Sequence, residues 1–118
     1  MTTEIGKELR KLRIDREERL LDMARYLGKS SSFVSAVEVG KKSPPSGFEE
    51  LVIKAYNLAD QAAEKMRQAA DQSRTAFTIK PSSARGRDTA GLLARRMNKL
   101  SEKELEEIHH ILQRGRSK

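Results

Sequence analysis

Apolar residues recur at every third or fourth position along most of this chain, which is the spacing that lines one face of an α-helix. Helices are predicted wherever that spacing holds, over residues 4–17, 20–27, 31–39, 48–57, 59–72, 88–99 and 102–113. Each apolar stripe is too short for a coiled coil. The pattern therefore predicts an all-α protein built from short helices that pack against one another.

Turn-forming residues separate the predicted helices. Gly28 lies between the second and third helices, where a left-handed backbone is favoured, and Ser30 follows it as a helix cap. Two prolines in the loop over residues 40–47 prevent the third helix from continuing. Ser101 and Glu104 have the spacing of a capping box, so the last helix is expected to begin directly after Ser101.

One segment, residues 73–80, departs from the helical period. Thr75, Phe77 and Ile79 alternate with other residues, which predicts a short strand. A single strand is not stable alone, so we expect it to pair, for example with the same strand of a second subunit. Residues 81–87 are rich in Ser, Gly and Arg and are predicted to form a flexible basic linker.

The predicted elements define three parts of the chain. Residues 1–72 form a helical domain, 73–87 the strand and linker, and 88–118 a C-terminal helical hairpin. The apolar stripes of the hairpin are too large to stay exposed on a monomer. They could cover the helix over 59–72, but we favour a homodimer. The expected dimer residues are Phe77, Ile79, Leu92, Leu93, Met97, Leu105, Ile108 and Leu112.

Composition narrows the function classes. The chain has 118 residues, a net charge of +7, no cysteine and only 4% aromatic residues. It therefore has no disulfide or zinc–thiolate site, and a protein that stacks single-stranded bases on aromatic platforms is not expected. No apolar run reaches membrane-spanning length and the first residues lack a signal-peptide core, so we expect no membrane contact and a cytoplasmic location.

The positive charge is concentrated in the second half of the chain. Residues 74–99 contain seven Lys and Arg residues and only one acidic residue, Asp88. Such a field attracts polyanions without specifying a sequence. Three interpretations remain open for this stretch: a soluble linker, which is the default, a contact to DNA phosphates, or an arginine-rich segment that binds RNA.

No enzyme is expected from the remaining residues. His109 and His110 are adjacent on a predicted helix and point about 100° apart, so they cannot chelate one metal ion together. The chain shows no Ser/His/Asp arrangement, no paired buried carboxylates and no glycine-rich phosphate loop. We therefore expect no catalytic residues, no metal and no cofactor.

The helix pair over residues 22–38 is the most informative segment. Met23, Ala24 and Leu27 form one inward stripe, and Val34 and Val37 form the other. Two short helices joined at a glycine, on a basic protein, are the usual way to present a helix end to the major groove of DNA. Double-stranded DNA is therefore the first partner to consider.

The segment from Leu9 to Leu58 resembles the lambda-repressor/Cro-like helix-turn-helix family, also called the XRE family. The residues that carry the resemblance are Leu9-Arg10-x-Leu12-Arg13, Met23-Ala24-x-x-Leu27-Gly28, Ser30, Val34 and Val37-Glu38-x-Gly40-Lys41. The resemblance covers nearly half of the chain and implies a five-helix Cro/repressor-like domain. It also implies an ion pair between Glu38 and Arg13 that ties the third helix to the first.

The resemblance further implies which residues meet DNA. Ser31 and Ser32 match positions that often read base edges, and Arg19 lies where the family offers polar groups to a phosphate. The expected DNA-binding set is Arg19, Lys29, Ser30, Ser31, Ser32, Ser35, Lys41 and Lys42. Phe33 matches a position that usually faces outward, and we expect it to fold back toward the core rather than to touch a thymine methyl group.

The sequence departs from the family where bases would be read. No Gln, Asn or Arg occurs between Ser31 and Val37, and these residue types make the strongest bidentate base contacts. Leu20 replaces a common glutamine. Either DNA shape and the surrounding basic residues supply specificity, or the third helix is a scaffold that no longer reads DNA well.

Two functions from different classes follow. The first is a sequence-specific transcriptional regulator, a repressor, that binds a palindromic operator as a homodimer. The alternative is a protein-interaction module such as an antitoxin, whose C-terminal region binds a toxin or another partner protein. Neither needs a catalytic site or a cofactor.

Overall fold

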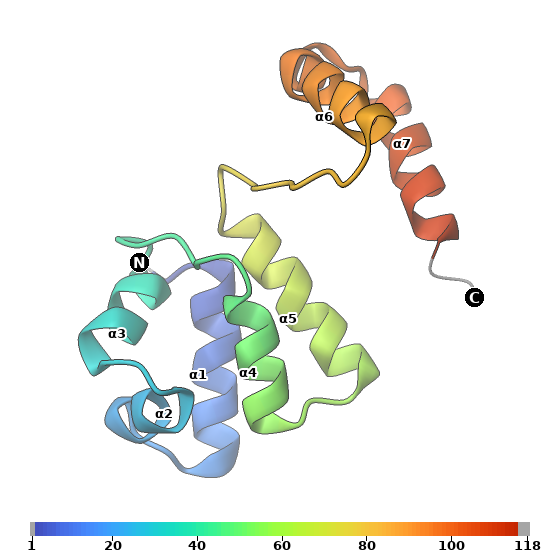
Figure 1. Ribbon diagram of the computed structural model, residues 1–118. Coiled ribbons are helices and arrows are strands. Elements are labelled where there is room, and N and C mark those ends of the chain that lie inside the picture. Colours follow the sequence, from blue (N-terminus) through green and yellow to red (C-terminus); the bar gives the residue numbers. More distant parts are fainter. Residues whose placement is uncertain (1, 116–118) are drawn as a thin grey trace. The chain divides into compact units, whose positions relative to one another are not determined.

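The computed structural model describes residues 2–115, and every regular element in that range is helical (Figure 1). The α-helices are α1 (Glu4–Arg16), α2 (Leu20–Leu27), α3 (Ser31–Val39), α4 (Phe48–Tyr56), α5 (Asp60–Gln72), α6 (Ala84–Arg96) and α7 (Glu102–Arg114), and a 3-10 turn, η1 (Met97–Lys99), follows α6. The chain divides between Thr78 and Ile79 into two compact units, which we call the N-terminal unit (residues 2–78) and the C-terminal unit (residues 79–115).

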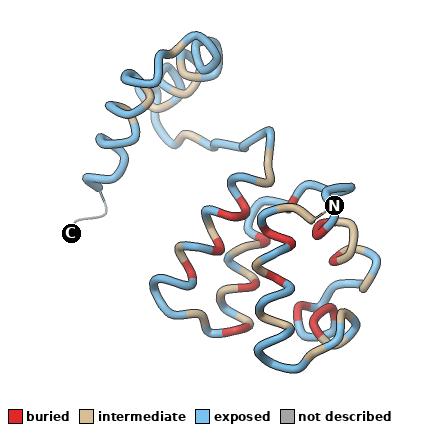
Figure 2. Tube along the Cα trace, turned by 180° about the vertical axis from the view of Figure 1, so that it is seen from behind, coloured by how far each residue is buried: buried red, intermediate tan, exposed pale blue. Residues whose placement is uncertain are grey.

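The five helices of the N-terminal unit surround one apolar core. α1 packs against α3 and α5, α2 against α3 and α4, and α4 against α5. Figure 2 shows the buried positions on the inward sides of these helices. The core consists of Ile5, Leu9, Met23, Ala24, Leu27, Val34, Val37, Phe48, Val52, Tyr56, Met66, Ala69 and Ala70. The inward stripes predicted for α2 and α3 are confirmed.

Helix ends in this unit follow from local residue chemistry. Gly28 ends α2 with φ +70° and Asn57 ends α4 with φ +49°, both in the left-handed region that glycine and asparagine tolerate best. The Ser30 hydroxyl accepts a hydrogen bond from the Phe33 backbone N–H at 3.0 Å, which satisfies one of the free donors at the start of α3. The turn between α2 and α3 is therefore determined by residues within it.

A close approach between α1 and the end of α3 requires a glycine. A Cβ atom at Gly6 would clash with the carbonyl oxygen of Glu38 and would lie 3.0 Å from its Cα. Thr3 caps α1 beside this place, and its backbone N–H donates to the same carbonyl oxygen at 2.9 Å. The two helices therefore meet at backbone level, and no sequence pattern had pointed to Gly6.

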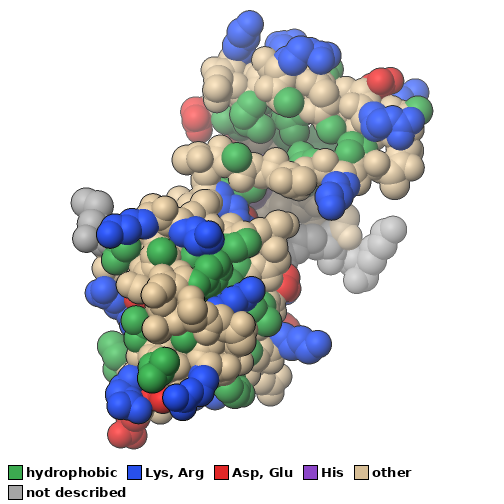
Figure 3. Space-filling model, turned by 60° about the vertical axis from the view of Figure 1, so that its left-hand side comes forward, with side chains coloured by type: hydrophobic (Ala, Val, Ile, Leu, Met, Phe, Trp, Pro, Cys, Tyr) green, Lys and Arg blue, Asp and Glu red, His purple; other side chains and the backbone are tan. Residues whose placement is uncertain are grey.

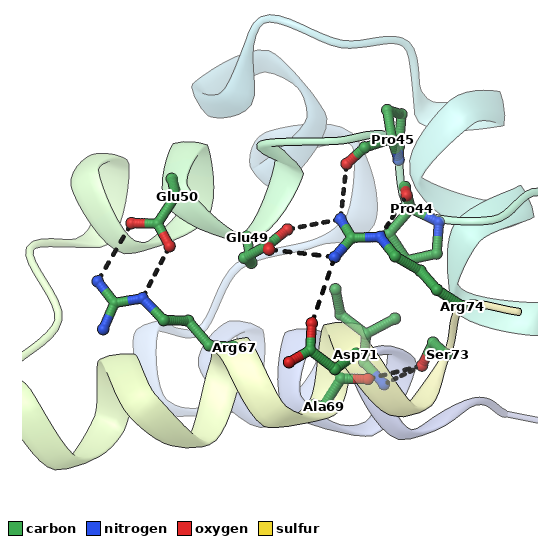
Figure 4. Close-up of polar contacts among 10 residues, drawn as sticks. Pro44, Pro45, Glu49, Glu50, Arg67, Ala69, Asp71, Ser73 and Arg74 are labelled. Carbon is green, nitrogen blue, oxygen red and sulfur yellow. Dashed lines mark hydrogen bonds and ion pairs between the residues drawn. The ribbon is translucent and has the colours of Figure 1, made fainter. Parts of the chain in front are cut away.

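Arg74 attaches the segment after α5 to the loop before α4 (Figure 4). Its guanidinium donates to the carbonyl oxygens of Pro44 at 2.9 Å and Pro45 at 2.7 Å, and to the Glu49 carboxylate at 2.6 and 3.1 Å. Only 8% of the Arg74 side chain and 14% of the Glu49 side chain is exposed. Arg74 is therefore a structural residue, and the basic stretch over 74–99 loses its first candidate for a phosphate contact.

The substitution Arg74→Ala is expected to lower the free energy of unfolding by about 2 kcal/mol, because it leaves the Glu49 carboxylate and two carbonyl oxygens without their donor. Arg67→Ala is the matched control. Arg67 holds Glu50 by a similar two-pronged contact that is far more exposed, and such pairs contribute less than about 1 kcal/mol. Urea unfolding measures both losses, and equal values would contradict the structural role of Arg74.

The same variant is expected to change the pH dependence of stability. Burial by itself would raise the pKa of Glu49, but the hydrogen bond from Arg74, a backbone hydrogen bond and the positive charge of Arg74 together hold that pKa below its usual 4.5. A carboxyl group with a lowered pKa stabilises the native state above its unfolded-state pKa, and the contribution is lost as pH falls through the folded value. The stability gap between wild type and Arg74→Ala should thus be full above pH 4.5 and narrow below it. Urea unfolding at several acidic pH values measures this difference in the free energy of unfolding. A difference that stays constant as pH falls would contradict the coupling.

The strand predicted over residues 73–80 is wrong. Residues 75–83 contain neither helix nor strand, and no strand occurs anywhere in residues 2–115. Three alternating residues do not make a strand without a neighbouring strand to accept and donate backbone hydrogen bonds, and none is present in this part of the chain. Phe77 and Ile79, expected in the dimer interface, are both exposed in this segment.

The C-terminal unit consists of α6, η1 and α7. α6 begins at Ala84, because the Ser83 hydroxyl caps it by accepting from the Gly86 backbone N–H at 3.0 Å. The flexible linker predicted over 81–87 is therefore wrong in its second half. The capping box of Ser101 and Glu104 is present at the start of α7, as predicted.

This unit has no core of its own. No residue from 79 to 115 is buried, and Figure 2 shows the unit in the colours of intermediate and exposed positions only. An open groove of about 400 Å³ lies between α6 and α7, lined by Leu92, Leu93, Leu100, Ile108, Ile111 and Leu112. The groove brings together four of the eight expected dimer residues, whereas Met97 and Leu105 do not line it.

Candidate nucleic-acid interface

The position of α3 is determined by its buried face. Val34 and Val37 are fully buried between α1 and α2. Ser32 is exposed, and Ser31 and Ser35 are half-buried. Because α3 is only nine residues long, this arrangement leaves its first turn and one side as a surface of small hydroxyl side chains.

An ion pair ties the last turn of α3 to α1. Arg13 donates to the Glu38 carboxylate through both terminal nitrogens, with Nη2 3.3 Å from Oε1. Arg10 adds a longer contact, with Nε 3.7 Å from the same oxygen. Only 13% of the Arg13 side chain and 4% of the Glu38 side chain is exposed. The pair expected from the resemblance is therefore formed, and Arg10, which the sequence did not single out, completes it.

The serine residues have different roles. Ser30 is the N-cap of α3, so its hydroxyl oxygen is already engaged with the backbone. For Ser31, Ser32 and Ser35, no side-chain hydrogen bond is found among residues 2–115. These three hydroxyl groups are the ones that could exchange hydrogen bonds with a ligand at the α3 surface.

Phe33 connects the α3 surface to the core. Its ring is half-buried and meets the Phe48 ring edge-on, with centroids 5.7 Å apart. The ammonium groups of Lys29 and Lys42 lie 5.4 and 5.7 Å from the centroid of the Phe33 ring. The expected core packing of Phe33 is thus seen. The ring also lies within cation–π distance of two lysines, Lys29 before α3 and Lys42 after it.

Arg19 lies at the start of α2 as its N-cap residue. Its backbone N–H donates to the Asp22 carboxylate at 2.9 Å, and its side chain makes a longer contact of 3.4 Å with the same oxygen. The backbone hydrogen bond, and then the side-chain bond, hold the pKa of Asp22 below its usual value. The Arg19 guanidinium remains largely exposed, so it is free to approach an external anion.

The loop after α3 turns at Gly40 and carries two exposed lysine side chains. Gly40 has φ +85° and turns the chain, and the Lys42 backbone N–H donates to the Ala36 carbonyl oxygen at 3.1 Å. Lys41 and Lys42 are both exposed. Along the chain, Arg19 and Lys29 precede α3, and Lys41 and Lys42 follow it. Of these four cations, Lys29 and Lys42 lie near the Phe33 ring of α3.

Some supporting residues could not be recognised from the sequence. The Tyr56 hydroxyl donates to the Glu18 carboxylate at 2.7 Å, and Arg16 donates to the Tyr56 carbonyl oxygen at 3.0 Å. Burial and the Glu18 contact raise the pKa of Tyr56 above its ordinary range. These contacts attach the loop between α1 and α2 to the end of α4. The only sequence signal was a tyrosine at an apolar position of a predicted helix.

Metal-ligating clusters and membrane-spanning helices are both absent from the described residues. Among residues 2–115, no group of three or more His, Cys, Asp or Glu residues is placed to hold a metal ion. His109 and His110 are both exposed on α7. None of the described helices has the length and apolar character needed to cross a membrane.

Comparison of the chain with protein-family models, with curated proteins and with solved structures finds no match. The candidate interface therefore rests on its geometry alone.

Proposed function

We propose that this protein is a sequence-specific DNA-binding transcriptional regulator, a repressor, in which α2 and α3 act as a helix-turn-helix. The observation that carries the proposal is the α3 surface of Ser31, Ser32 and Ser35, beside which the ammonium groups of Lys29 and Lys42 lie near the Phe33 ring. The opposite face of α3 is buried and its last turn is held by Glu38 and Arg13. A short helix held rigidly at one end and polar at the other suits insertion into a major groove.

The proposal assigns roles to the residues at this surface. Ser31, Ser32 and Ser35 contact base edges or their bound water, and the four cations that precede and follow α3 along the chain contact phosphates. Backbone contacts position a protein on the duplex, whereas base contacts specify sequence. Serine discriminates weakly among bases, so we infer that much of the specificity comes from the shape and flexibility of the operator.

The arrangement in the N-terminal unit also supports a Cro/repressor-like domain. The residues that carry the resemblance occupy the inward stripes of α2 and α3, the turn at Gly28 and the ion pair of Glu38. One such domain reads half of a site, so the proposed repressor binds a palindrome as a homodimer.

Selection from a random pool of duplex DNA, performed at two salt concentrations, tests this function. The expected result is an enriched palindrome with half-sites about one helical turn apart. Binding that is not enriched for any sequence and fades as salt rises would contradict the proposal, since it would reflect charge alone.

The lysines near Phe33 give a quantitative test on the selected operator. Lys29→Ala and Lys42→Ala are each expected to reduce the slope of log K against log salt by about 0.9, because each loses one phosphate contact. Lys65→Ala is the matched control, since Lys65 is exposed on α5 and should leave the slope unchanged. A slope that does not change in the first two variants would remove these lysines from the interface.

A further inference from the structure

Within the C-terminal unit, no segment covers the apolar groove between α6 and α7. Leu92 on α6 and Ile111 and Leu112 on α7 line it, and each is more than half exposed. Figure 3 shows hydrophobic side chains gathered at the surface of this unit, in the upper part of the view, with basic side chains around them. An apolar surface of this kind on a charged protein marks an interaction site.

The C-terminal unit leaves its apolar stripes in water. No residue from 79 to 115 is buried within it, although α6 and α7 both contribute apolar side chains to the groove. Removing apolar surface from water is favourable, so covering this groove would stabilise both helices.

Charge distribution identifies the occupant. α6 carries Arg85, Arg87, Arg95 and Arg96 against Asp88 alone, whereas the first turns of α7 carry Glu102, Glu104, Glu106 and Glu107 against Lys103. The charges of α6 and α7 favour one arrangement of two copies about a two-fold axis, in which α6 of each protomer lies beside α7 of the other. In that arrangement basic and acidic helices alternate around a four-helix bundle, and both apolar stripes turn inward.

We propose that the groove between α6 and α7 is the dimer interface of this protein, occupied by the same groove of a second copy. Only the purpose of the dimer, which is to place two α3 helices on one palindrome, rests on the proposed function. Self-association itself is independent of DNA, so it is measured without DNA.

Sedimentation equilibrium of the full chain tests the proposal. The wild-type protein is expected to be a dimer at micromolar concentration. The double variant Ile111→Asp, Leu112→Asp is expected to raise the dimer dissociation constant by more than about 100-fold, because each interface would have to bury four carboxylates. These side chains are 57% and 69% exposed in one copy, so the substitutions remove little from the monomer itself.

Ile14→Asp is the matched control. Ile14 is 74% exposed on α1 and is not among the residues that line the groove, so this variant should stay dimeric. The N-terminal unit has its own buried core, so cooperative thermal unfolding, measured for each variant by circular dichroism, would show that this unit is folded. A dimer that also weakens between 0.1 and 1 M salt would support the pairing of α6 with α7 of the partner.

Several outcomes would overturn the inference. A monomeric wild-type protein would do so, as would a double variant that dimerises as well as wild type. A monomer that instead forms a stable complex with a different protein through the groove would assign the surface to that partner. If the dimer forms through the groove but no palindrome is enriched from random DNA, the inference stands and the proposed function fails.

Discussion

Glu38→Gln is expected to lower the free energy of unfolding by about 3–5 kcal/mol, the largest stability effect that we anticipate in this protein. The substitution leaves the Arg13 guanidinium, whose side chain is only 13% exposed, without its counter-charge. It also weakens the attachment of α3 to α1, since Glu38 lies at their closest approach. For a unit of this size the midpoint of thermal unfolding should fall by at least about 12 °C, as measured by circular dichroism.

Two controls separate the buried pair from surface charge. Arg10→Ala removes an exposed partner 3.7 Å from the same carboxylate and should cost less than about 1 kcal/mol. The double variant Arg13→Met, Glu38→Leu removes both buried charges and should recover much of the lost stability, since well-packed apolar replacements of buried pairs are often neutral. If Glu38→Gln were no more destabilising than Arg10→Ala, the pair would not be a structural anchor.

Changing both Ser31 and Ser32 to Glu is expected to abolish specific DNA binding, with a loss of at least about 100-fold in affinity. The proposal places this surface of α3 in the major groove of DNA. The negative potential of the phosphates there would repel the two new carboxylates. The midpoint of thermal unfolding should remain nearly unchanged, because acidic residues in the first turn of a helix interact favourably with its dipole. Fluorescence anisotropy with the selected operator measures the affinity.

The double variant Gln61→Glu, Ala62→Glu is the matched control for net charge. It adds two carboxylates at exposed positions in the first turn of α5, a helix that the proposal keeps away from DNA. Its affinity should fall by less than about 10-fold, through the change in overall charge alone. Survival of operator binding in the Ser31 and Ser32 variant, or an equal loss in the control, would show that α3 is not the reading helix.

Most of the N-terminal unit could be predicted from local sequence. The helices over 20–27 and 31–39 begin and end where the apolar period and the residues Gly28 and Ser30 indicated. Helical periodicity also assigned the buried faces of α2 and α3, because an amphipathic helix turns its apolar stripe toward the core. These are local effects, so a single sequence is enough to reveal them.

The candidate site was predictable in part. The helix pair followed from its apolar spacing, whereas the candidate DNA-binding residues and the pair of Glu38 with Arg13 came from the resemblance. The grouping of Lys29 and Lys42 around Phe33 could not be predicted, since it depends on how the loop after α3 folds back. Chain distance gives no information about such contacts.

The sequence by itself determined that this protein is helical, basic and built around a short helix pair, because helix period, capping residues and charge are properties of neighbouring residues. Only the tertiary structure decided that Arg74 is a buried anchor rather than a free cation, that residues 75–79 form no strand, and that Gly6 lies at a backbone crossing. It also decided that α6 and α7 leave an apolar groove open. Each of these depends on which distant surfaces meet and which polar groups they satisfy, and such long-range pairings are not encoded in any local pattern.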